Sequence, residues 1–384
     1  MKKLIISGDA GTGKSYYLAG LMKEALDNNK SFIALAFTHS AVNNISSIFS
    51  KLYNIDINNK CKTFHSYFAI SVDGKIGKKY HDKLNYIFID EYSLIPIDLF
   101  DKVKDNINCD NLIICGDYKQ LKPINIKPEI SYVKLYDYIN KYGPLNSAVI
   151  EAICHYENIL ISMPFFKDAD KKILTEQKRN NNKVFNIIQG LVFGKNEVKC
   201  SYIMKSTLLS LMNQNYTFIA SKYEYLFKIH SFINTRKKYD FRIKQKNNSF
   251  KEFYLSKGDK VIITENIKYG DEIITNGDEY VFEDYVNKSL VLSRDDNKIF
   301  IDMINDCYPI LPANVITYHK AQGKSYDNVI LCVDNLFDFT MLYTGLSRAR
   351  NDILLFTFDD NKVEPSADKY KALEMIMNNF ISNK

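Results

Sequence analysis

The stretch that decides the fold is residues 8–15, which read Gly8-Asp9-Ala10-Gly11-Thr12-Gly13-Lys14-Ser15. A short apolar run at residues 4–6 comes before it, and a helix-like stretch at residues 16–28 follows. This order of strand, glycine-rich loop and helix is that of a P-loop, whose backbone N–H groups surround an anion beside a helix N-terminus. The lysine of such a loop reaches the β- and γ-phosphates, and the hydroxyl after it holds Mg²⁺. The stretch therefore predicts a nucleoside triphosphate site, with Lys14 and Ser15 in these roles.

The composition is that of an ordinary soluble globular protein, with 46% apolar and 25% charged residues among 384. This length suits two or three domains with sizeable cores. The net charge of +6 permits a polyanionic partner without establishing one. Seven cysteines without a C-x-x-C pair favour free thiols in a reducing compartment, so we expect a cytoplasmic protein. No apolar run is long enough to span a bilayer, and the Lys-, Asn- and Ile-rich chain fits an AT-rich genome, such as that of a virus or phage.

Apolar strands alternate with helices in two parts of the chain. The first set of strands is expected at residues 4–6, 32–37, 86–89 and 112–115, and the second at 217–220, 314–317, 329–332 and 353–356. Buried strands that alternate with helices favour a parallel sheet covered on both faces. The fold class is therefore α/β, with two such sheets.

Two segments interrupt this pattern with β character. Residues 250–305 contain four short strand-like runs joined by Gly, Asn and Asp turns, which predicts a small β insertion, a barrel. Residues 70–79 contain Asp73-Gly74 between short alternating runs, which is a hairpin signal. Taken alone, the second segment is most simply a surface hairpin.

Two carboxylates end the strand at residues 86–89. In a P-loop enzyme the first, Asp90, helps to hold Mg²⁺, and the second, Glu91, orients or deprotonates the attacking water. The next buried strand runs into a polar loop that contains Gln120, whose neutral amide can sense a γ-phosphate without adding charge. An exposed loop glutamine is the simpler interpretation of Gln120 alone.

Short polar side chains follow other strands. Thr38 and His39 come after the second strand, and Thr63 and His65 occur in a similar phrase. Such positions suit phosphate contacts at helix N-termini. Plain N-capping by the two threonines is the simpler interpretation when each is taken alone.

Candidate residues also occur late in the chain. Thr317, His319 and Lys320 lie in the phrase Thr-Tyr-His-Lys-Ala-Gln-Gly, and Arg348 lies in Leu-Tyr-Thr-Gly-Leu-Ser-Arg. Arg179 ends Leu-Thr-Glu-Gln-Lys-Arg. Each arginine alone is most simply a surface residue, but together they are candidates to complete an ATP site from a second lobe, since an arginine finger neutralises charge on the transferred phosphoryl group.

Taken together, these motifs resemble those of superfamily 1 helicases. Thr63-Phe64-His65-Ser66 resembles the Thr-x-His-Ser element of the 5′-to-3′ branch, and the likeness is greatest to the phage Dda and RecD type. Asn276-Gly277-Asp278 resembles the signature of the small barrel domain in that group. The ordered matches cover residues 8–15, 38–41, 90–91, 116–120, 179, 317–323 and 343–350.

The resemblance implies two RecA-like lobes and a division of the chain. Residues 1–170 are the first lobe, with a hairpin or strand-separating pin at 62–84. Residues 171–249 and 306–384 are the second lobe, and 250–305 are an SH3-like β-barrel inserted into it. A monomer that uses ATP and Mg²⁺ on single-stranded DNA is expected, with RNA as a possible substrate.

The resemblance also implies residue roles. The P-loop residues Gly8, Asp9, Ala10, Gly11, Thr12, Gly13, Lys14 and Ser15 bind the nucleotide, and Ser15 and Asp90 hold Mg²⁺. The catalytic residues are Lys14, Glu91, Gln120, Arg179 and Arg348. The residues that line the path of the single strand are Thr38, His39, Thr63, His65, Thr317, His319 and Lys320.

The sequence departs from the family before its first strand. The family usually has an adenine-reading glutamine there, whereas only residues 1–3 precede the strand in this sequence, so we do not expect strict preference for ATP. Two other functions stay open. One is an RNA helicase like those of positive-strand RNA viruses, and the other is a nucleotide-dependent switch that clamps nucleic acid without unwinding it.

Overall fold

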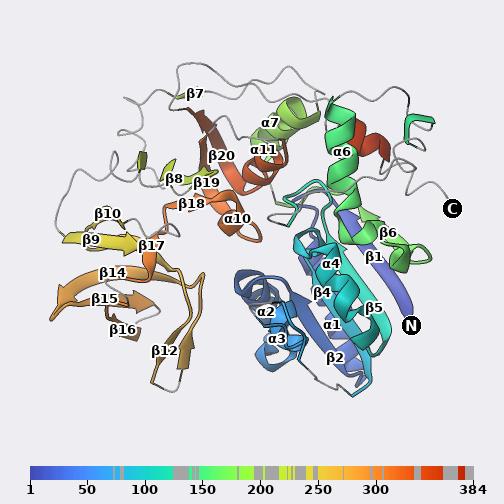
Figure 1. Ribbon diagram of the computed structural model, residues 1–384, viewed down its shortest axis with the longest axis horizontal. Coiled ribbons are helices and arrows are strands. Elements are labelled where there is room, and N and C mark those ends of the chain that lie inside the picture. Colours follow the sequence, from blue (N-terminus) through green and yellow to red (C-terminus); the bar gives the residue numbers. More distant parts are fainter. Residues whose placement is uncertain are drawn as a thin grey trace. The chain divides into compact units, whose positions relative to one another are not determined.

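The computed structural model in Figure 1 forms two compact units. The first contains residues 1–199, 338–347 and 365–384, and the second contains 200–337 and 348–364. Within these spans the structure describes residues 1–71, 74–77, 82–123, 138–140, 143, 147–179, 181–193, 202–203, 216–222, 224–225, 228–229, 239–244, 250–270, 272–294, 297–304, 307–332, 339–357 and 371–376.

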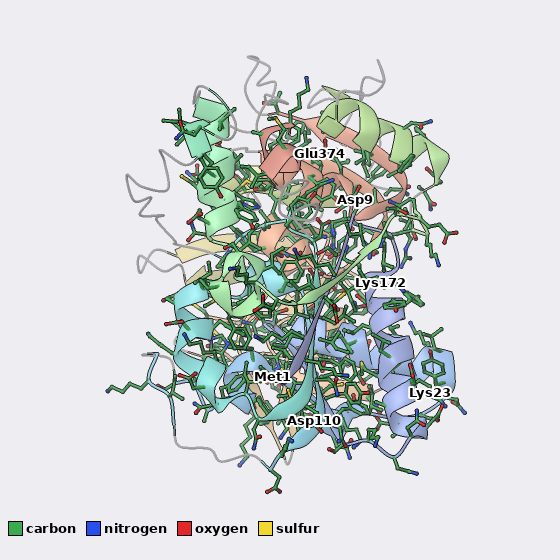
Figure 2. The ribbon with its side chains drawn as sticks, turned by 90° about the vertical axis from the view of Figure 1, so that its right-hand side faces the viewer. Met1, Asp9, Lys23, Asp110, Lys172 and Glu374 are labelled. Atoms are coloured by element: carbon green, nitrogen blue, oxygen red, sulfur yellow. The ribbon has the colours of Figure 1, made fainter. Side chains whose placement is uncertain are left out.

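The first unit is built on a six-stranded sheet with the order β3-β2-β4-β5-β1-β6, in which every neighbouring pair is parallel. The strands are β1 (Lys2–Gly8), β2 (Phe32–Ala36), β3 (Cys61–Thr63), β4 (Leu84–Asp90), β5 (Cys109–Gly116) and β6 (Asp170–Leu174). Figure 2 shows Met1 and Asp110, near the starts of β1 and β5, far from Asp9, which follows β1. The carboxyl ends of the strands therefore meet at one edge, where the loops carry the predicted phosphate and Mg²⁺ residues.

Helices cover both faces of this sheet. Those that pack on it are α1 (Lys14–Asp27), α2 (His39–Tyr53), α3 (Phe64–Tyr67), α4 (Ile97–Val103) and α6 (Ser147–Glu157). Two further helices of this unit, α7 (Asn182–Phe193) and α11 (Phe339–Leu346), pack against each other. Phe88 packs with the buried residues of α1 and α2, whereas its neighbours Ile87 and Ile89 pack with those of α4 and α6. This alternation arises because successive side chains of a strand point to opposite faces. The predicted parallel sheet, covered on both faces, is confirmed.

The boundary of the first unit differs from the predicted one at residue 170. Residues 171–199, 338–347 and 365–384, assigned to the second lobe from the sequence, belong to the first unit. The physical reasons are specific contacts. Strand β6 pairs with β1, helix α11 packs against α7, and Leu373 lies in the same core cluster as Ile87.

The second unit has its own parallel sheet, with the order β18-β8-β19-β20-β7. Its elements are β7 (Tyr202–Ile203), β8 (Tyr216–Ala220), β18 (Val315–Thr317), α10 (Tyr318–Ala321), β19 (Tyr326–Cys332) and β20 (Ala349–Phe356). The four strands predicted for the second set lie within β8, β18, β19 and β20, apart from Asn314, which immediately precedes β18. The second predicted α/β sheet is therefore confirmed as well.

The strands between β8 and β18 in the sequence pair in antiparallel fashion. Their main sheet has the order β16-β15-β14-β11-β17. The strands are β9 (Tyr239–Lys244), β10 (Phe250–Leu255), β11 (Lys260–Ile263), β12 (Ile267–Tyr269), β13 (Glu272–Ile274), β14 (Glu279–Val286), β15 (Ser289–Arg294), β16 (Asn297–Ile301) and β17 (Ile310–Pro312). Gly277 has a φ of 101°, and the Asp278 carboxylate accepts hydrogen bonds from the Thr275 N–H and hydroxyl at 2.9 Å. The predicted Asn-Gly-Asp phrase thus makes the turn into β14.

The predicted hairpin segment is described in part. Ile70 and Ile76 form an antiparallel bridge, and Gly74, with a φ of 75°, donates its N–H to the Ser71 carbonyl. Val72, Asp73 and residues 78–81 lie outside the described residues. A chain reversal at Gly74 agrees with the predicted turn. In the described part of the chain, no helix has the length and apolarity needed to cross a membrane.

Candidate functional site

The phosphate loop has the curled backbone that its glycines predict. Gly11 and Gly13 have φ values of 86° and 80°, in the left-handed region that other residues seldom adopt. Gly13 is also the N-cap of α1. The Lys14 ammonium is buried and donates hydrogen bonds to the Gly8 carbonyl at 2.8 Å and the Asp9 carbonyl at 2.9 Å. The loop therefore holds its lysine inward, at the centre of the backbone curl.

The two predicted acids lie at the carboxyl end of β4, beside this loop. The Ser15 hydroxyl donates to Asp90 Oδ2 at 3.0 Å, and the Glu91 N–H donates to Asp90 Oδ1 at 2.9 Å. Burial raises the pKa of Asp90 above its usual range, and the adjacent Glu91 charge adds to this. Within the described residues, the buried Oε2 atom of Glu91 has no hydrogen-bond partner.

This arrangement fits a magnesium ion. In nucleotide sites Mg²⁺ is held by one or two carboxylates together with phosphate oxygens and water, rather than by a cage of protein ligands. Asp90 and the Ser15 hydroxyl supply such a set. The described part of the chain has no group of three His, Cys, Asp or Glu residues that could form a cage.

The loop after β5 carries Gln120, whose side chain is buried. The simpler interpretation, an exposed loop glutamine, is therefore wrong. Gln120 Nε2 donates to Asp117 Oδ2 at 3.2 Å. Asp117 is fully buried and lies 3.9 Å from the Lys14 ammonium. Gln120 therefore belongs to the polar cluster around the phosphate loop, through an aspartate that the sequence did not single out.

Arg179 is also placed beside the phosphate loop, in the first unit. Gln177 Nε2 donates to the Ala10 carbonyl and the Lys178 N–H donates to the Gly11 carbonyl, both at 2.8 Å. Arg179 Nη1 donates to the Ser347 carbonyl at 3.3 Å. The sequence expected Arg179 to come from the second lobe, but these backbone contacts hold its segment against the P-loop within one unit.

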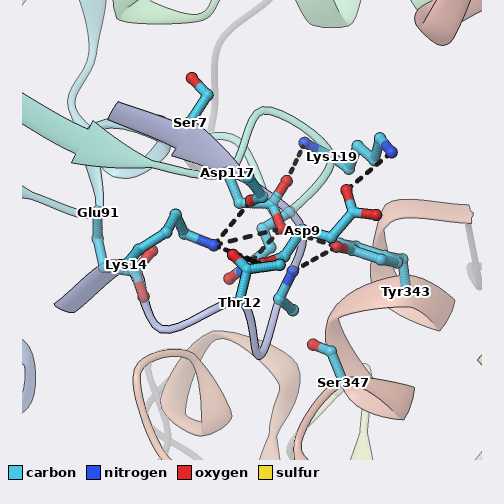
Figure 3. Close-up of polar contacts among 12 residues, drawn as sticks. Ser7, Asp9, Thr12, Lys14, Glu91, Asp117, Lys119, Tyr343 and Ser347 are labelled. Atoms are coloured by element: carbon cyan, nitrogen blue, oxygen red, sulfur yellow. Dashed lines mark hydrogen bonds and ion pairs between the residues drawn. The ribbon is translucent and has the colours of Figure 1, made fainter. Parts of the chain in front are cut away.

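Sequence reasoning did not single out Tyr343 of α11. Its buried hydroxyl accepts a hydrogen bond from the Ala10 N–H at 2.7 Å and donates one to Asp117 Oδ2 at 2.8 Å. Figure 3 shows Tyr343 directed toward Asp117. Burial raises the pKa of Tyr343 well above its usual range, so the hydroxyl keeps its proton. Tyr343 belongs to the motif Leu-Tyr-Thr-Gly-Leu-Ser-Arg, but nothing in the sequence indicates its contact with a loop 333 residues away.

The remaining predicted residues lie at strand ends in both units. Thr38, Thr63 and Thr317 follow or end β2, β3 and β18, and each side chain caps the next helix, accepting the backbone N–H of Ala41, Ser66 or Lys320. The N-capping interpretation of Thr38 and Thr63 is therefore confirmed, and Thr317 caps α10 in the same way. His39 begins α2, and His319 and Lys320 lie in α10.

Two of these side chains have perturbed proton affinities. Burial lowers the pKa of His65, whose ring lies 4.9 Å from that of Phe37. Burial, with a smaller effect of the Lys324 charge, lowers the pKa of Lys320 to about 8. His65 therefore favours its neutral form, which can stack on a base, whereas Lys320 is a cation whose charge is sensitive to pH near 8.

Arg348 lies in the second unit, unlike the phosphate loop. It is buried, and its Nη1 donates to the Lys324 carbonyl at 3.2 Å. The Arg348 carbonyl accepts the Tyr326 N–H at 2.9 Å. The structure thus anchors Arg348 immediately before β20, and its predicted role stays a prediction.

Comparison with known families and proteins agrees with these motifs. Residues 1–125 match the AAA domain family, and residues 312–355 match the UvrD-like helicase C-terminal domain family. The ATP-dependent DNA helicase Pif1 of Campylobacter jejuni is 24% identical over an alignment that covers 94% of this chain and 89% of the relative. The RecBCD subunit RecD of Buchnera aphidicola is 24% identical, with 92% and 70% covered. The protein MJ1519 of Methanocaldococcus jannaschii is 26% identical over 93% of this chain, which spans 37% of that relative's length.

Solved structures share the fold. Pif1 helicase from Bacteroides, in complex with ADP-AlF3 and single-stranded DNA, has a TM-score of 0.63 at 16% identity, with 100% of this chain and 94% of that chain covered. Pif1 helicase from Candida albicans has a TM-score of 0.62 at 16% identity, with 98% and 95% covered. Both α/β parallel sheets of the present chain therefore have the architecture of the RecA-like lobes of Pif1. The chain is similar to superfamily 1 helicases of the Pif1 and RecD type, which confirms the resemblance that its motifs predicted.

Proposed function

We propose that this chain is an ATP-dependent DNA helicase that moves 5′-to-3′ on single-stranded DNA and separates duplex. The observation that carries the proposal is the hydrogen bond between Ser15 of the phosphate loop and Asp90, with Glu91 buried beside it. A P-loop alone binds nucleotide, whereas this grouping also positions a metal and a water-activating carboxylate. The similar Campylobacter protein is named as an ATP-dependent DNA helicase, and the Bacteroides Pif1 structure contains ADP-AlF3 and single-stranded DNA.

Nucleotide binding, in this proposal, exchanges the internal contacts of the phosphate loop for contacts to phosphate. Lys14 leaves the carbonyls of Gly8 and Asp9 and turns to the β- and γ-phosphates. The N–H groups of the loop and the N-terminus of α1 face the same charge. Ser15 and Asp90 would hold Mg²⁺, which neutralises charge between the β- and γ-phosphates when bound.

Hydrolysis would then depend on four further side chains. Glu91 orients the attacking water and accepts its proton through the buried oxygen that lacks a partner in the described chain. Gln120 senses the γ-phosphate and passes its state to the strand path. Arg179 and Arg348 neutralise charge on the transferred phosphoryl group.

The strand path would be lined by Thr38, His39, Thr63 and His65 in the first unit, and by Thr317, His319 and Lys320 in the second. Helices α2, α3 and α10 begin directly after these threonines, and backbone N–H groups at a helix N-terminus are donors that a phosphate can accept. Contacts of this kind read the backbone rather than the base, so binding should be sensitive to salt and largely independent of sequence.

The architecture in this proposal consists of two RecA-like lobes, one built on each parallel sheet. The antiparallel strands between residues 250 and 305 would form an SH3-like barrel, and residues 62–84 would supply the pin that parts the duplex. ATP-driven changes in the grip of the two lobes on the strand would give stepping. A monomer suffices for this cycle, and the free cysteines found in the described residues fit a reducing cytoplasm.

The proposal is tested by ATP hydrolysis with and without single-stranded DNA. Stimulation by DNA is expected, and Lys14→Ala should abolish it, because the lysine meets the transferred phosphoryl group. Lys23→Ala, at the far end of α1, is the matched control and should hydrolyse ATP normally. Stimulation by RNA alone would favour the RNA helicase, and hydrolysis without strand separation would favour the clamp.

A further inference from the structure

An unusual set of charges surrounds the phosphate loop. The carboxylates of Asp9, Asp117 and Glu374 lie close to the ammonium groups of Lys14 and Lys119. Asp9 is itself a residue of the loop, so one negative charge stands where a triphosphate must bind. Since like charges repel, this carboxylate requires a compensating cation in the bound state.

Lys119 supplies that cation. Its Nζ is 2.9 Å from Asp9 Oδ1 and 3.7 Å from Glu374 Oε1, and its backbone N–H donates to Asp117 Oδ1 at 3.0 Å. Figure 3 shows Lys119 reaching from the loop after β5 to Asp9. The side chain of Lys119 is 6% exposed, whereas that of Asp9 is 40% exposed. The cation is thus held in place by its surroundings, and the acid faces outward.

Nucleotide binding affects Lys14 and Lys119 differently. In this structure Lys14 lies 3.9 Å from Asp117, so it offsets part of the acidic charge. Once Lys14 turns to the phosphates, Lys119 is left to balance Asp9. Glu374, in the helical residues 371–376, lies 3.7 Å from the same Lys119 ammonium and adds a negative charge of its own.

We propose that Lys119 is a positioning residue for nucleotide binding, which neutralises Asp9 so that the loop accepts a triphosphate, and that Glu374 opposes it. The proposal rests on the proposed function, since it concerns the same phosphate loop. It also gives the helical residues 371–376 a part in nucleotide affinity.

The test measures the dissociation constants of ATP, ADP and AMP for the full chain, by competition with a fluorescent nucleotide. Lys119→Met should weaken ATP binding about tenfold, the size expected for an uncompensated charge within a few ångströms of the site. The loss should shrink from ATP to ADP to AMP, because it scales with phosphate charge. Lys119→Arg keeps the charge and should bind ATP like the unchanged protein.

Three further variants separate charge from structure. Asp9→Asn added to Lys119→Met removes both charges and should restore ATP affinity. Glu374→Gln should tighten ATP binding about twofold, opposite in sign to Lys119→Met, since it removes a repelling charge. Lys23→Met breaks the ion pair of Lys23 with Asp27 on α1, at 2.5 Å, and should leave ATP affinity unchanged.

The proposal is overturned if Lys119→Met weakens all three nucleotides equally, or if Asp9→Asn fails to restore the double variant. ATP affinity that does not respond to Lys119→Met overturns it too, even where the unchanged protein hydrolyses ATP and unwinds DNA. Conversely, Lys119-dependent ATP binding without any strand separation supports this inference and contradicts the proposed helicase.

Discussion

Glu91 combines two costly features at the end of β4. Its φ is 54°, in the left-handed region, and such a conformation costs a residue other than glycine about 1–3 kcal/mol. Its Oε2 atom is buried and, among the described residues, accepts no hydrogen bond. Glu91 directly follows Asp90, and its Oε2 atom can accept the proton of an attacking water.

Glu91→Gln should leave binding of ATP and of single-stranded DNA intact while turnover falls about 10²–10⁴-fold, the usual contribution of a general base. The amide keeps the shape of the side chain but cannot accept the proton. Steady-state ATP hydrolysis and fluorescence binding check this, with the exposed Asp101→Asn as control. Turnover within twofold of the unchanged protein would rule out the base.

Lys320 should make DNA binding depend on pH. Burial lowers its pKa to about 8, so the side chain loses its charge between pH 7 and pH 9. Affinity for single-stranded DNA should fall about tenfold over that range, the size of one charge-assisted hydrogen bond. Lys320→Arg stays protonated and should flatten the profile. A profile that Lys320→Arg leaves unchanged would contradict the assignment.

Deprotonation of Lys320 does not itself destabilise the fold, because its effect on stability has the opposite sign. The pKa of Lys320 is lower in the folded protein than the ordinary value of 10.5, so the unfolded chain binds more protons between pH 8 and 10.5. The free energy of unfolding contributed by Lys320 therefore rises with pH across that window. A melting curve at each pH separates stability from binding.

At the scale of single residues, the sequence predicted the local chemistry and missed the long-range contacts. Gly8–Ser15 and the pair Asp90 and Glu91 were readable because each motif is contiguous. The partners of Lys119 and Tyr343 were not, since Asp9 is 110 residues from Lys119 and Ala10 is 333 residues from Tyr343. Only the fold brings such side chains together.

At the scale of elements, β1 and β6 approach each other closely at Gly8. A Cβ atom on Gly8 would lie 2.5 Å from the Leu174 carbonyl oxygen and 2.8 Å from Thr12 Oγ1. Gly8→Ala should therefore lower the free energy of unfolding by about 1–3 kcal/mol, as overpacking does. Gly20→Ala is the control, because its Cβ would meet only the Tyr53 hydroxyl at 3.9 Å and alanine favours the helix. Equal melting temperatures for Gly8→Ala and the unchanged chain would contradict this packing.

The turn at Gly74 yields a prediction about unwinding. Opening duplex DNA costs about 1.4 kcal/mol per base-pair step, which corresponds to about tenfold in rate. Shortening the segment between Ile70 and Ile76 should slow unwinding about tenfold while leaving DNA-stimulated ATP hydrolysis within about twofold. Equal losses of both activities would make the segment structural only. Parallel assays on one preparation decide between them.

Buried strands could be predicted from the sequence, whereas the exposed edge strand β6 could not. The strands β1, β2, β4 and β5 were expected because each contains a continuous apolar run. Strand β6 was not expected, since it reads Asp-Lys-Lys-Ile-Leu and lies at the edge of the sheet, mostly exposed. Its place depends on backbone pairing with β1, which leaves no periodic signal in its side chains.

At the scale of the whole molecule, the chain returns to its first unit twice after building the second. Residues 338–347 bring Tyr343 to the phosphate loop, and residues 365–384 bring Glu374 to Lys119. A division into consecutive lobes could not show this, because the connections are long and the returning segments are short. The segment that brings Tyr343 to the phosphate loop ends at Ser347, and the next residue is Arg348.

Directional unwinding driven by ATP is tested most directly with duplexes that carry a single-stranded tail on one end only. Strand separation is measured in the presence of ATP and Mg²⁺, with Glu91→Gln as the inactive control. The duplex with a 5′ tail should be unwound, and the duplex with a 3′ tail should not. Unwinding from the 3′ tail alone, or from neither tail despite ATP hydrolysis, would contradict it.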